Sequence, residues 1–382
     1  MKILILGAGR MGLGAAFDLT HNSPVENVTI ADVDIERARA VVATVKSDRL
    51  KPVQVDVTNQ ADVVALMRGH DAAISCVGYY HNLQLAQCAI EARVNFCDLG
   101  GNNTVVDAEL ALDAVARAAG INIIPDCGLA PGMVSVLAEH GAARFTTLDE
   151  IHIRVGGLPQ QPKPPLDYQI IFSVDGLINE YVERARVIRD GAITDVESMT
   201  ELERLEFPAP FGMLEAFQTS GGTSTLPDSF HGRVRELDYK TIRYPGHCEK
   251  FRTMIDLGLT SSDPIEIDGV LTTARRAFIE MLLRNLPAGE PDVVLVRLDV
   301  RGIVDNKPRA LRYDIIDYYD QKSGLSAMMR TTAFPASIIA QMMARGETLM
   351  KGATPQEKCI QPEKFVAELA VRKINIVETY VE

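Results

Sequence analysis

The chain has 382 residues, of which 47% are hydrophobic and 24% charged, and its formal net charge is −12. This composition is typical of a globular protein with about two domains, each large enough to bury its own core. The negative net charge and the lack of a basic tract argue against binding to nucleic acid or to an anionic membrane, and favour a cationic small substrate.

The sequence also indicates where the protein works. No apolar run approaches the ~20 residues that a membrane-spanning helix needs. The first predicted strand begins at Lys2, which leaves no room for a signal or transit peptide. The 6 cysteines form no C-x-x-C pair and no His–Cys spacing typical of zinc. We expect a cytoplasmic protein with reduced thiols and no bound metal.

The first predicted element is an apolar strand that ends at Leu6 and runs directly into Gly7-Ala8-Gly9-Arg10-Met11-Gly12 and then a helix. A G-x-G-x-x-G sequence between a strand and a helix is typical of dinucleotide binding. Gly7 permits the tight turn, Gly9 lets the backbone approach the pyrophosphate, and Gly12 lets the helix pack on the strand. Arg10 and Met11 open that helix, whose N-terminus attracts phosphate.

The second predicted strand, residues 28–31, ends in Asp32. A carboxylate at this position accepts hydrogen bonds from both ribose hydroxyls and repels a 2′-phosphate, so NAD is favoured over NADP. Capping of the next helix is the alternative role for Asp32, but Asp34 can supply that cap. Arg37 or Arg39 could instead receive a 2′-phosphate, which leaves NADP open.

Strands and helices continue to alternate up to residue 125. Strands are predicted at 52–55, 72–75, 95–97 and 122–124, and helices at 35–45, 60–67, 83–92 and 106–119. This order predicts a Rossmann-type, doubly wound parallel sheet in residues 1–125, whose ligand lies beyond the carboxyl ends of the strands. Further cofactor contacts are therefore expected at Asp56, Cys76, Val77, Gly78, Leu99 and Gly100.

The pattern changes in residues 126–328. Strand-like runs at 151–157, 253–260, 293–300 and 311–318 lack the intervening helices. They predict a second α+β domain with a mixed or antiparallel sheet. An apolar helix at 334–345 then indicates a return to the first domain, which residues 329–382 would complete, and a last helix is predicted at 362–372.

Loop sequences in both domains resemble the saccharopine dehydrogenase-like family of nicotinamide-dependent enzymes. The matching stretches are 5–12, 31–34, 98–101, 125–133, 155–159, 164–166, 214–217, 219–226 and 240–247. The resemblance implies a Rossmann domain completed by C-terminal segments, and a sheet-based domain for substrate binding and dimerisation. It also implies a homodimer or larger homo-oligomer that binds a small amine or amino acid.

One departure from the family refines the expected substrate. Ala130-Pro131-Gly132 stands where saccharopine-forming members carry Asp-Pro-Gly, and the acid falls four residues earlier, at Asp126. The resemblance is therefore to the members that oxidise the ε-amino group of L-lysine with NAD, giving an aldehyde that cyclises, NADH and ammonia. A saccharopine or carboxynorspermidine dehydrogenase-type imine reductase is the alternative, and a non-catalytic nicotinamide-binding regulator is a second.

Amine oxidation requires a base near the amine and a cation for the substrate carboxylate. Asp126, at the end of the sixth strand, can hold the ammonium or direct water; its alternative role is to cap the helix that starts at Met133. His247 can take a proton, or be purely structural. Arg243 can bind a carboxylate, or pair with Glu249.

Four further side chains are candidates for the same site. Tyr79 and Tyr80 follow the fourth strand, where the nicotinamide should lie; one is expected to contact the ring or the substrate, and the other to pack. Thr219 and Ser220 begin a polar loop with backbone donors that can bind a carboxylate, although a plain turn would have the same sequence. The second domain is expected to close over the substrate and bring Arg243 and His247 to it.

Overall fold

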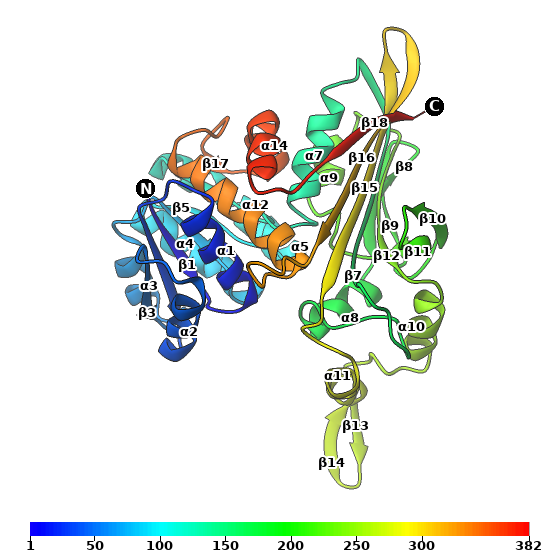
Figure 1. Ribbon diagram of the computed structural model, residues 1–382, viewed down its shortest axis with the longest axis horizontal. Coiled ribbons are helices and arrows are strands. Elements are labelled where there is room, and N and C mark those ends of the chain that lie inside the picture. Colours follow the sequence, from blue (N-terminus) through cyan, green and yellow to red (C-terminus); the bar gives the residue numbers. More distant parts are fainter. Residues whose placement is uncertain (382) are drawn as a thin grey trace. The chain divides into compact units, whose positions relative to one another are not determined.

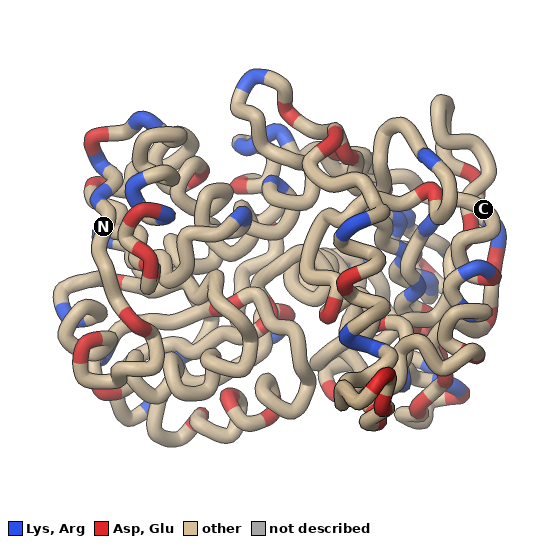
Figure 2. The backbone as a smooth tube through the Cα atoms, turned by 90° about the horizontal axis from the view of Figure 1, so that it is seen from below, with Lys and Arg blue, Asp and Glu red and all other residues tan. Residues whose placement is uncertain are grey.

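The computed structural model describes residues 1–381, which divide into two compact units (Figure 1). The first unit contains residues 1–145, 224–229 and 329–376. The second contains residues 146–223, 230–328 and the chain from Val377. In both units basic and acidic residues are interspersed (Figure 2), and the sequence has no basic tract.

A seven-stranded parallel sheet forms the centre of the first unit, in the order β17-β6-β5-β4-β1-β2-β3. Its strands are β1 (Lys2–Leu6), β2 (Asn27–Asp32), β3 (Leu50–Gln54), β4 (Ala72–Ser75), β5 (Asn95–Cys97), β6 (Asn122–Ile124) and β17 (Gly352–Ala353). The strand order reverses between β1 and β4, and such a reversal opens a ligand crevice at the carboxyl ends of the strands.

Helices connect and cover these strands (Figure 1). They are α1 (Arg10–His21), α2 (Ile35–Val45), α3 (Gln60–Met67), α4 (Asn82–Ala92), α5 (Asn103–Leu110), α6 (Asp113–Ala119), α7 (Met133–Ala142), α9 (Leu226–Phe230), α12 (Ala327–Ala344), α13 (Gln356–Cys359) and α14 (Pro362–Val371). Helix α12 lies against α1, because a Cβ at Gly14 would stand 2.9 Å from that of Ala333. The core consists of apolar strand residues such as Leu4 and Phe96, both fully buried.

The second unit is built on a nine-stranded mixed sheet, in which β7 and β12 are parallel and the other pairs antiparallel. Its strands are β7 (Thr147–Pro159), β8 (Ala185–Arg189), β9 (Ala192–Val196), β10 (Glu203–Phe207), β11 (Gly212–Gln218), β12 (Glu236–Arg243), β15 (Asp292–Val304), β16 (Lys307–Tyr318) and β18 (Val377–Val381). Helices α8 (Val174–Val182), α10 (His247–Asp256) and α11 (Ala274–Asn285) share an apolar core, and a hairpin, β13 (Pro264–Ile267) and β14 (Val270–Thr273), projects beyond α11 (Figure 1).

The predicted fold class is confirmed, namely a Rossmann-type parallel sheet plus a second domain with a mixed sheet. The strand predicted at 253–260 is wrong, because α10 occupies residues 247–256 and buries Cys248 and Phe251, three residues apart. The helix predicted at 106–119 is two helices, α5 and α6. Helix α12 starts before the predicted 334 and continues through Pro335.

None of the helices in residues 1–381 combines the length and the apolar character that crossing a bilayer requires.

Candidate active site

In the turn between β1 and α1, each of the three glycines occupies a position where the predicted role requires a residue without a side chain. Gly7 has φ +103°, and a Cβ on it would stand 2.7 Å from the carbonyl oxygen of Cys76. A Cβ on Gly12 would stand 1.9 Å from the carbonyl oxygen of Gly7. Around Gly9 there is nothing within 4 Å of the corresponding position, so its backbone faces open space at the N-terminus of α1. These residues fit a dinucleotide pyrophosphate.

Asp32 closes the same turn from the end of β2. Its carboxylate accepts hydrogen bonds from the backbone N–H of Ala8 at 2.8 Å and of Asp34 at 3.0 Å. The helix cap is Asp34, whose side chain accepts from the N–H of Glu36. The two arginines that follow are exposed and lie beside other carboxylates, Arg37 near Asp34 and Arg39 near Glu36.

The remaining predicted cofactor residues lie at the carboxyl ends of the strands. Asp56 is exposed and accepts hydrogen bonds from the N–H and hydroxyl of Thr58, which lower its pKa. The N–H of Cys76 bonds the carbonyl of Leu6 at 2.7 Å and joins β4 to β1. Val77 is half-buried and Gly78 exposed. Leu99 and Gly100 continue from the end of β5, beside Asp126.

Asp126 is the centre of a buried group of carboxyls at the ends of β5 and β6. It is 1% exposed, and its backbone has φ 62°. Its side chain accepts a hydrogen bond from the hydroxyl of Ser224. Burial, with the neighbouring charge of Asp98, raises the pKa of Asp126 to about 8. It does not cap the following helix, whose N-cap is Gly132.

Asp98 and Glu109 complete this carboxyl group. One oxygen of Asp98 accepts from the N–H of Gly100 at 2.6 Å and of Asp126 at 3.3 Å. The carboxyl group of Glu109, from α5, lies against that of Asp98, and both residues are fully buried. The loops after β5 and β6 are thus joined through Asp98.

Arg243 and His247 meet in the second unit, around Tyr181 of α8. The Nε–H of Arg243 donates to the Tyr181 hydroxyl at 2.8 Å, and Nε2 of His247 lies 3.1 Å from the same oxygen. Nδ1 of His247 bonds the carbonyl of Leu166 at 3.0 Å. Burial and the nearby Arg243 lower the pKa of His247 to about 3, so the ring is neutral.

Arg243 is 2% exposed, and no carboxylate within residues 1–381 forms an ion pair with it. The pairing with Glu249 that the sequence left open is not formed. Its guanidinium lies 5.0 Å from the ring centre of Tyr168. Glu180 is the nearby acid, and burial raises its pKa to about 7 against the attraction of Arg243. A buried guanidinium of this kind is suited to a substrate carboxylate.

The other four predicted residues have different surroundings. Thr219 and Ser220 are buried, and their hydroxyls bond Thr241 at 2.7 Å and the carbonyl of Asn179 at 3.3 Å. Tyr79 and Tyr80 form a 3₁₀ turn with their rings edge to face. Tyr80 is 70% exposed, whereas Tyr79 is half-buried beside Gly101.

Sequence reasoning did not identify Ser224, Glu109, Tyr181 or Glu180. Ser224 lies 98 positions from Asp126, and no motif connects the two. Glu109 sits in a helix whose sequence shows no unusual feature. An acidic residue among the apolar positions of a helix is the one indication that could have identified it.

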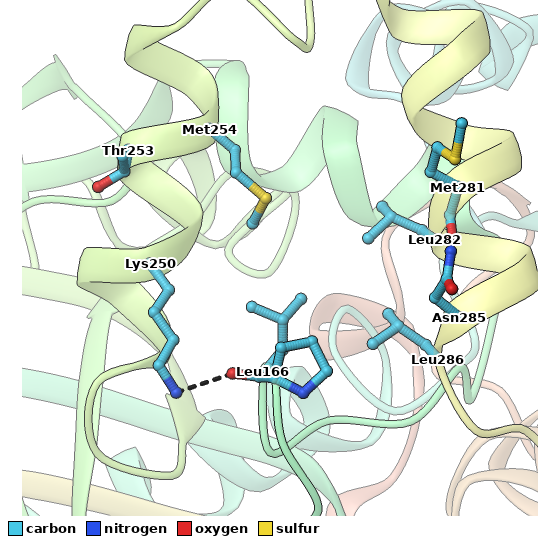
Figure 3. Close-up of a pocket in the computed structure, with 9 residues that line it drawn as sticks. Leu166, Lys250, Thr253, Met254, Met281, Leu282, Asn285 and Leu286 are labelled. Atoms are coloured by element: carbon cyan, nitrogen blue, oxygen red, sulfur yellow. Dashed lines mark hydrogen bonds between the residues drawn. The ribbon is translucent and has the colours of Figure 1, made fainter.

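An apolar pocket of ~500 Å³ lies between α10 and α11 in the second unit (Figure 3). Leu166, Met254, Leu282 and Leu286 point into it. The ammonium group of Lys250, at the edge of the pocket, donates a hydrogen bond to the carbonyl oxygen of Pro165 at 2.8 Å. None of the predicted site residues lines this pocket, and it offers no carboxylate to receive a proton from an amine.

The chain matches the models of a known protein family over both of its units. The chain matches the saccharopine dehydrogenase NADP binding domain over residues 3–124 and the saccharopine dehydrogenase C-terminal domain over residues 128–374. It is 25% identical over 282 residues to the L-glutamate-forming, NADP(+) saccharopine dehydrogenase of Saccharomyces cerevisiae, covering 70% of this chain and 60% of that enzyme. The chain therefore spans less than two thirds of that relative.

A second relative and two solved structures, one of them of the yeast enzyme, match over nearly their full length. Carboxynorspermidine synthase of Vibrio cholerae is 23% identical, with 96% of this chain and 94% of that protein covered. The structure of apo saccharopine dehydrogenase from Saccharomyces cerevisiae has a TM-score of 0.81 at 19% identity, with 100% of both chains covered. Homospermidine synthase of Legionella pneumophila, solved with NAD, has a TM-score of 0.69 at 12% identity, covering 100% of this chain and 91% of that one.

These structural likenesses show the fold, and the two family models together cover nearly the whole chain. The chain belongs to the saccharopine dehydrogenase family.

Proposed function

We propose that the protein is an NAD-dependent amine dehydrogenase that oxidises the ε-amino group of L-lysine, the reaction of a lysine 6-dehydrogenase. The ε-carbon loses a hydride and the nitrogen loses a proton, which gives an imine. Water then hydrolyses the imine to the aldehyde and releases the nitrogen as ammonium. Lysine, NAD⁺ and water give the aldehyde, NADH, ammonium and one proton, and the aldehyde cyclises to a piperideine carboxylate. Bound nicotinamide supplies the hydride acceptor.

The observation that carries this proposal is the buried carboxyl group of Asp126. An ε-ammonium has an ordinary pKa near ~10.4, and it must lose a proton before the nitrogen lone pair can assist hydride departure. A carboxylate whose pKa is raised to about 8 is a far better base than an ordinary aspartate. Ser224 holds the side chain in one orientation.

NAD is proposed over NADP because Asp32 ends β2, and a carboxylate there suits the ribose hydroxyls and repels a 2′-phosphate. Arg37 and Arg39, the two cations that could accept that phosphate, lie beside Asp34 and Glu36 instead. The matching domain is described as NADP binding and the yeast relative uses NADP(+), while the homospermidine synthase was solved with NAD.

Arg243 is proposed to bind the α-carboxylate of lysine, which its burial without an ion pair supports. His247 stays a predicted base. Both its ring nitrogens are engaged here, so proton uptake at Nε2 would require the Tyr181 hydroxyl to stop donating to that nitrogen and to accept from it instead. The predicted homo-oligomer and cytoplasmic location also stay predictions.

Steady-state kinetics test these roles. Asp126→Ala should lower kcat/KM for L-lysine by about 10²-fold or more, as for loss of a general base. Arg243→Ala should chiefly raise KM, and less for a diamine without the carboxylate. If His247 transfers a proton, His247→Ala should also cost about 10²-fold. Near-wild-type kinetics in all three variants would contradict the site, while the family assignment would stand.

A second candidate is the imine reductase type of reaction, which joins an amine to an aldehyde or keto acid. The near-complete match to carboxynorspermidine synthase favours it. Against it stands Ala130 in place of the acid expected in saccharopine-forming members. A strict requirement for a carbonyl co-substrate, with no ammonia released, would establish this alternative.

A further inference from the structure

Glu109 is a buried acid, and its carboxyl group receives no hydrogen bond from a donor group in the described residues. The same holds for Oδ2 of Asp98, the outer oxygen of that carboxyl group, whereas Oδ1, the inner oxygen, receives backbone N–H bonds. The two carboxyl groups nevertheless lie against one another, close enough for a proton to be shared between them. Two buried carboxyl groups this close together cannot both stay ionised, so the pair holds one proton between them.

The surroundings decide which residue carries that proton. Asp98 accepts two backbone N–H bonds on its inner oxygen, from Gly100 and Asp126, and such bonds favour the ionised form. Glu109 has no comparable donors, and its burial strongly disfavours a charge. The neutral acid is therefore Glu109, which donates its O–H to the outer oxygen of Asp98.

We propose that Glu109 is a positioning residue that stays neutral and donates its proton to Asp98, so that Asp98 remains ionised, holds the two loops together and acts on the carboxyl of Asp126. This inference rests on the proposed role of Asp126 as base. It assigns to α5 a part in the reaction that neither the sequence motifs nor the comparisons indicate.

The charges that face these groups are mostly negative. Asp126 faces Asp98, Glu357 from α13 and Asp107 from α5, with the Ser224 hydroxyl as its donor. Glu109 faces Asp98 and Asp126, and burial with these charges raises its pKa to about 10. The thiols of Cys76 and Cys127 also lie near Asp98, and burial raises the pKa of both.

Two substitutions of Glu109 separate donation from mere packing. Glu109→Gln keeps an N–H donor for Asp98 and should leave Asp98 ionised. Glu109→Leu removes the donor, so the buried Asp98 becomes neutral and no longer repels the charge on Asp126. The pKa of Asp126 then falls. Asp98→Asn removes the same charge directly and shows how far the pKa of Asp126 moves when residue 98 carries no charge. If the leucine variant fails to fold, the infrared measurement below tests Glu109 itself.

The first measurement is the pH dependence of kcat/KM for L-lysine. In Glu109→Leu and Asp98→Asn the limb assigned to Asp126 should move to lower pH by about one unit or more, whereas Glu109→Gln should keep its wild-type position. A purely structural role would lower the rate in these variants without moving the limb, and that result would overturn the proposal.

The second measurement does not depend on activity. Infrared spectra of the folded protein at pH 7 should contain a neutral carboxylic acid C=O band that is lost in Glu109→Gln and kept in the surface control Glu91→Gln. If Glu109→Gln loses no such band, Glu109 is ionised and the proposal fails. If the band is lost but no lysine oxidation occurs, the failure lies in the proposed function alone.

Discussion

The carboxyl group of Asp126 occupies the space in which a side chain at position 100 would lie, and residue 100 is a glycine. Gly100 has φ +72°, and a Cβ on it would stand 1.7 Å from Oδ1 of Asp126. That oxygen belongs to a buried side chain held by Ser224, so it cannot move aside freely. The position of the proposed base, Asp126, therefore depends on Gly100, a neighbour that has no side chain.

Gly100→Ala should therefore displace Asp126 and lower kcat by about 10²-fold, the usual cost of a misplaced catalytic group. Gly120→Ala is the matched control, because Gly120 also has a positive φ, +76°, but nothing lies within 4 Å of its Cβ position. Both variants carry backbone strain, and the unfolding free energy measures it. Equal activity in the two would contradict the steric argument.

Asp32 gives a prediction about the cofactor at the same scale. Fluorescence titration should show NADH binding more tightly than NADPH. Asp32→Ala should lose ribose hydrogen bonds worth roughly 1–3 kcal/mol and narrow that preference. Equal affinity of the wild-type protein for both cofactors would mean that Asp32 does not select between them.

At the level of elements, the start of α10 is fixed by an acid from another strand. Glu215 of β11 accepts hydrogen bonds from the N–H of Gly246 at 2.9 Å and of Cys248 at 2.8 Å. These are donors that a helix N-terminus leaves without intrahelical partners. Glu215 thereby fixes the turn that carries His247, whose ring packs between α8 and the sheet.

Glu215→Ala should lower the free energy of unfolding by about 1–2 kcal/mol, the cost of losing a helix N-cap. Urea denaturation measures the loss. Glu249→Ala, an exposed acid in the first turn of the same helix, should cost less because its charge is screened by water. A larger loss for Glu249→Ala would show that the bonds of Glu215 add little.

Most elements of the first unit could be predicted because each satisfies a local pattern. The apolar strands, the glycine turn and the cap at Asp34 agree with the structure within a few residues. The strand predicted at 253–260 failed because a short alternating run of apolar residues does not distinguish a strand from an amphipathic helix. The contacts that stabilise α10 as a helix include the bonds to Glu215, which are not local in sequence.

At the scale of the molecule, the first unit is assembled from three separate stretches of chain. Residues 224–229 bring Ser224 to Asp126, and bring Thr225 and Ser229 to Glu357. The sequence predicted the acid at Asp126 from its place at a strand end. Its hydroxyl donor could not be predicted, because the contact depends on a tertiary arrangement that no motif encodes.

The buried acids make the stability of the protein depend on pH. Between about pH 4 and pH 8 Asp126 is ionised when unfolded but protonated when folded, so the native state binds more protons and stability falls as pH rises. Asp126→Asn should make this decline shallower by up to about 1.4 kcal/mol per pH unit. Thermal melts across this range test it, with the exposed Asp48→Asn as control; equal slopes in both variants would contradict the raised pKa.

The proposed reaction releases the ε-nitrogen of L-lysine as ammonium, and isotope labelling follows that nitrogen. Purified protein is supplied with NAD⁺ and L-lysine carrying ¹⁵N at the ε position, without any aldehyde or keto acid. NADH and ¹⁵N-ammonium should form in equal amounts. Unlabelled ammonium, or NADH formation that fails without a carbonyl co-substrate, would contradict it.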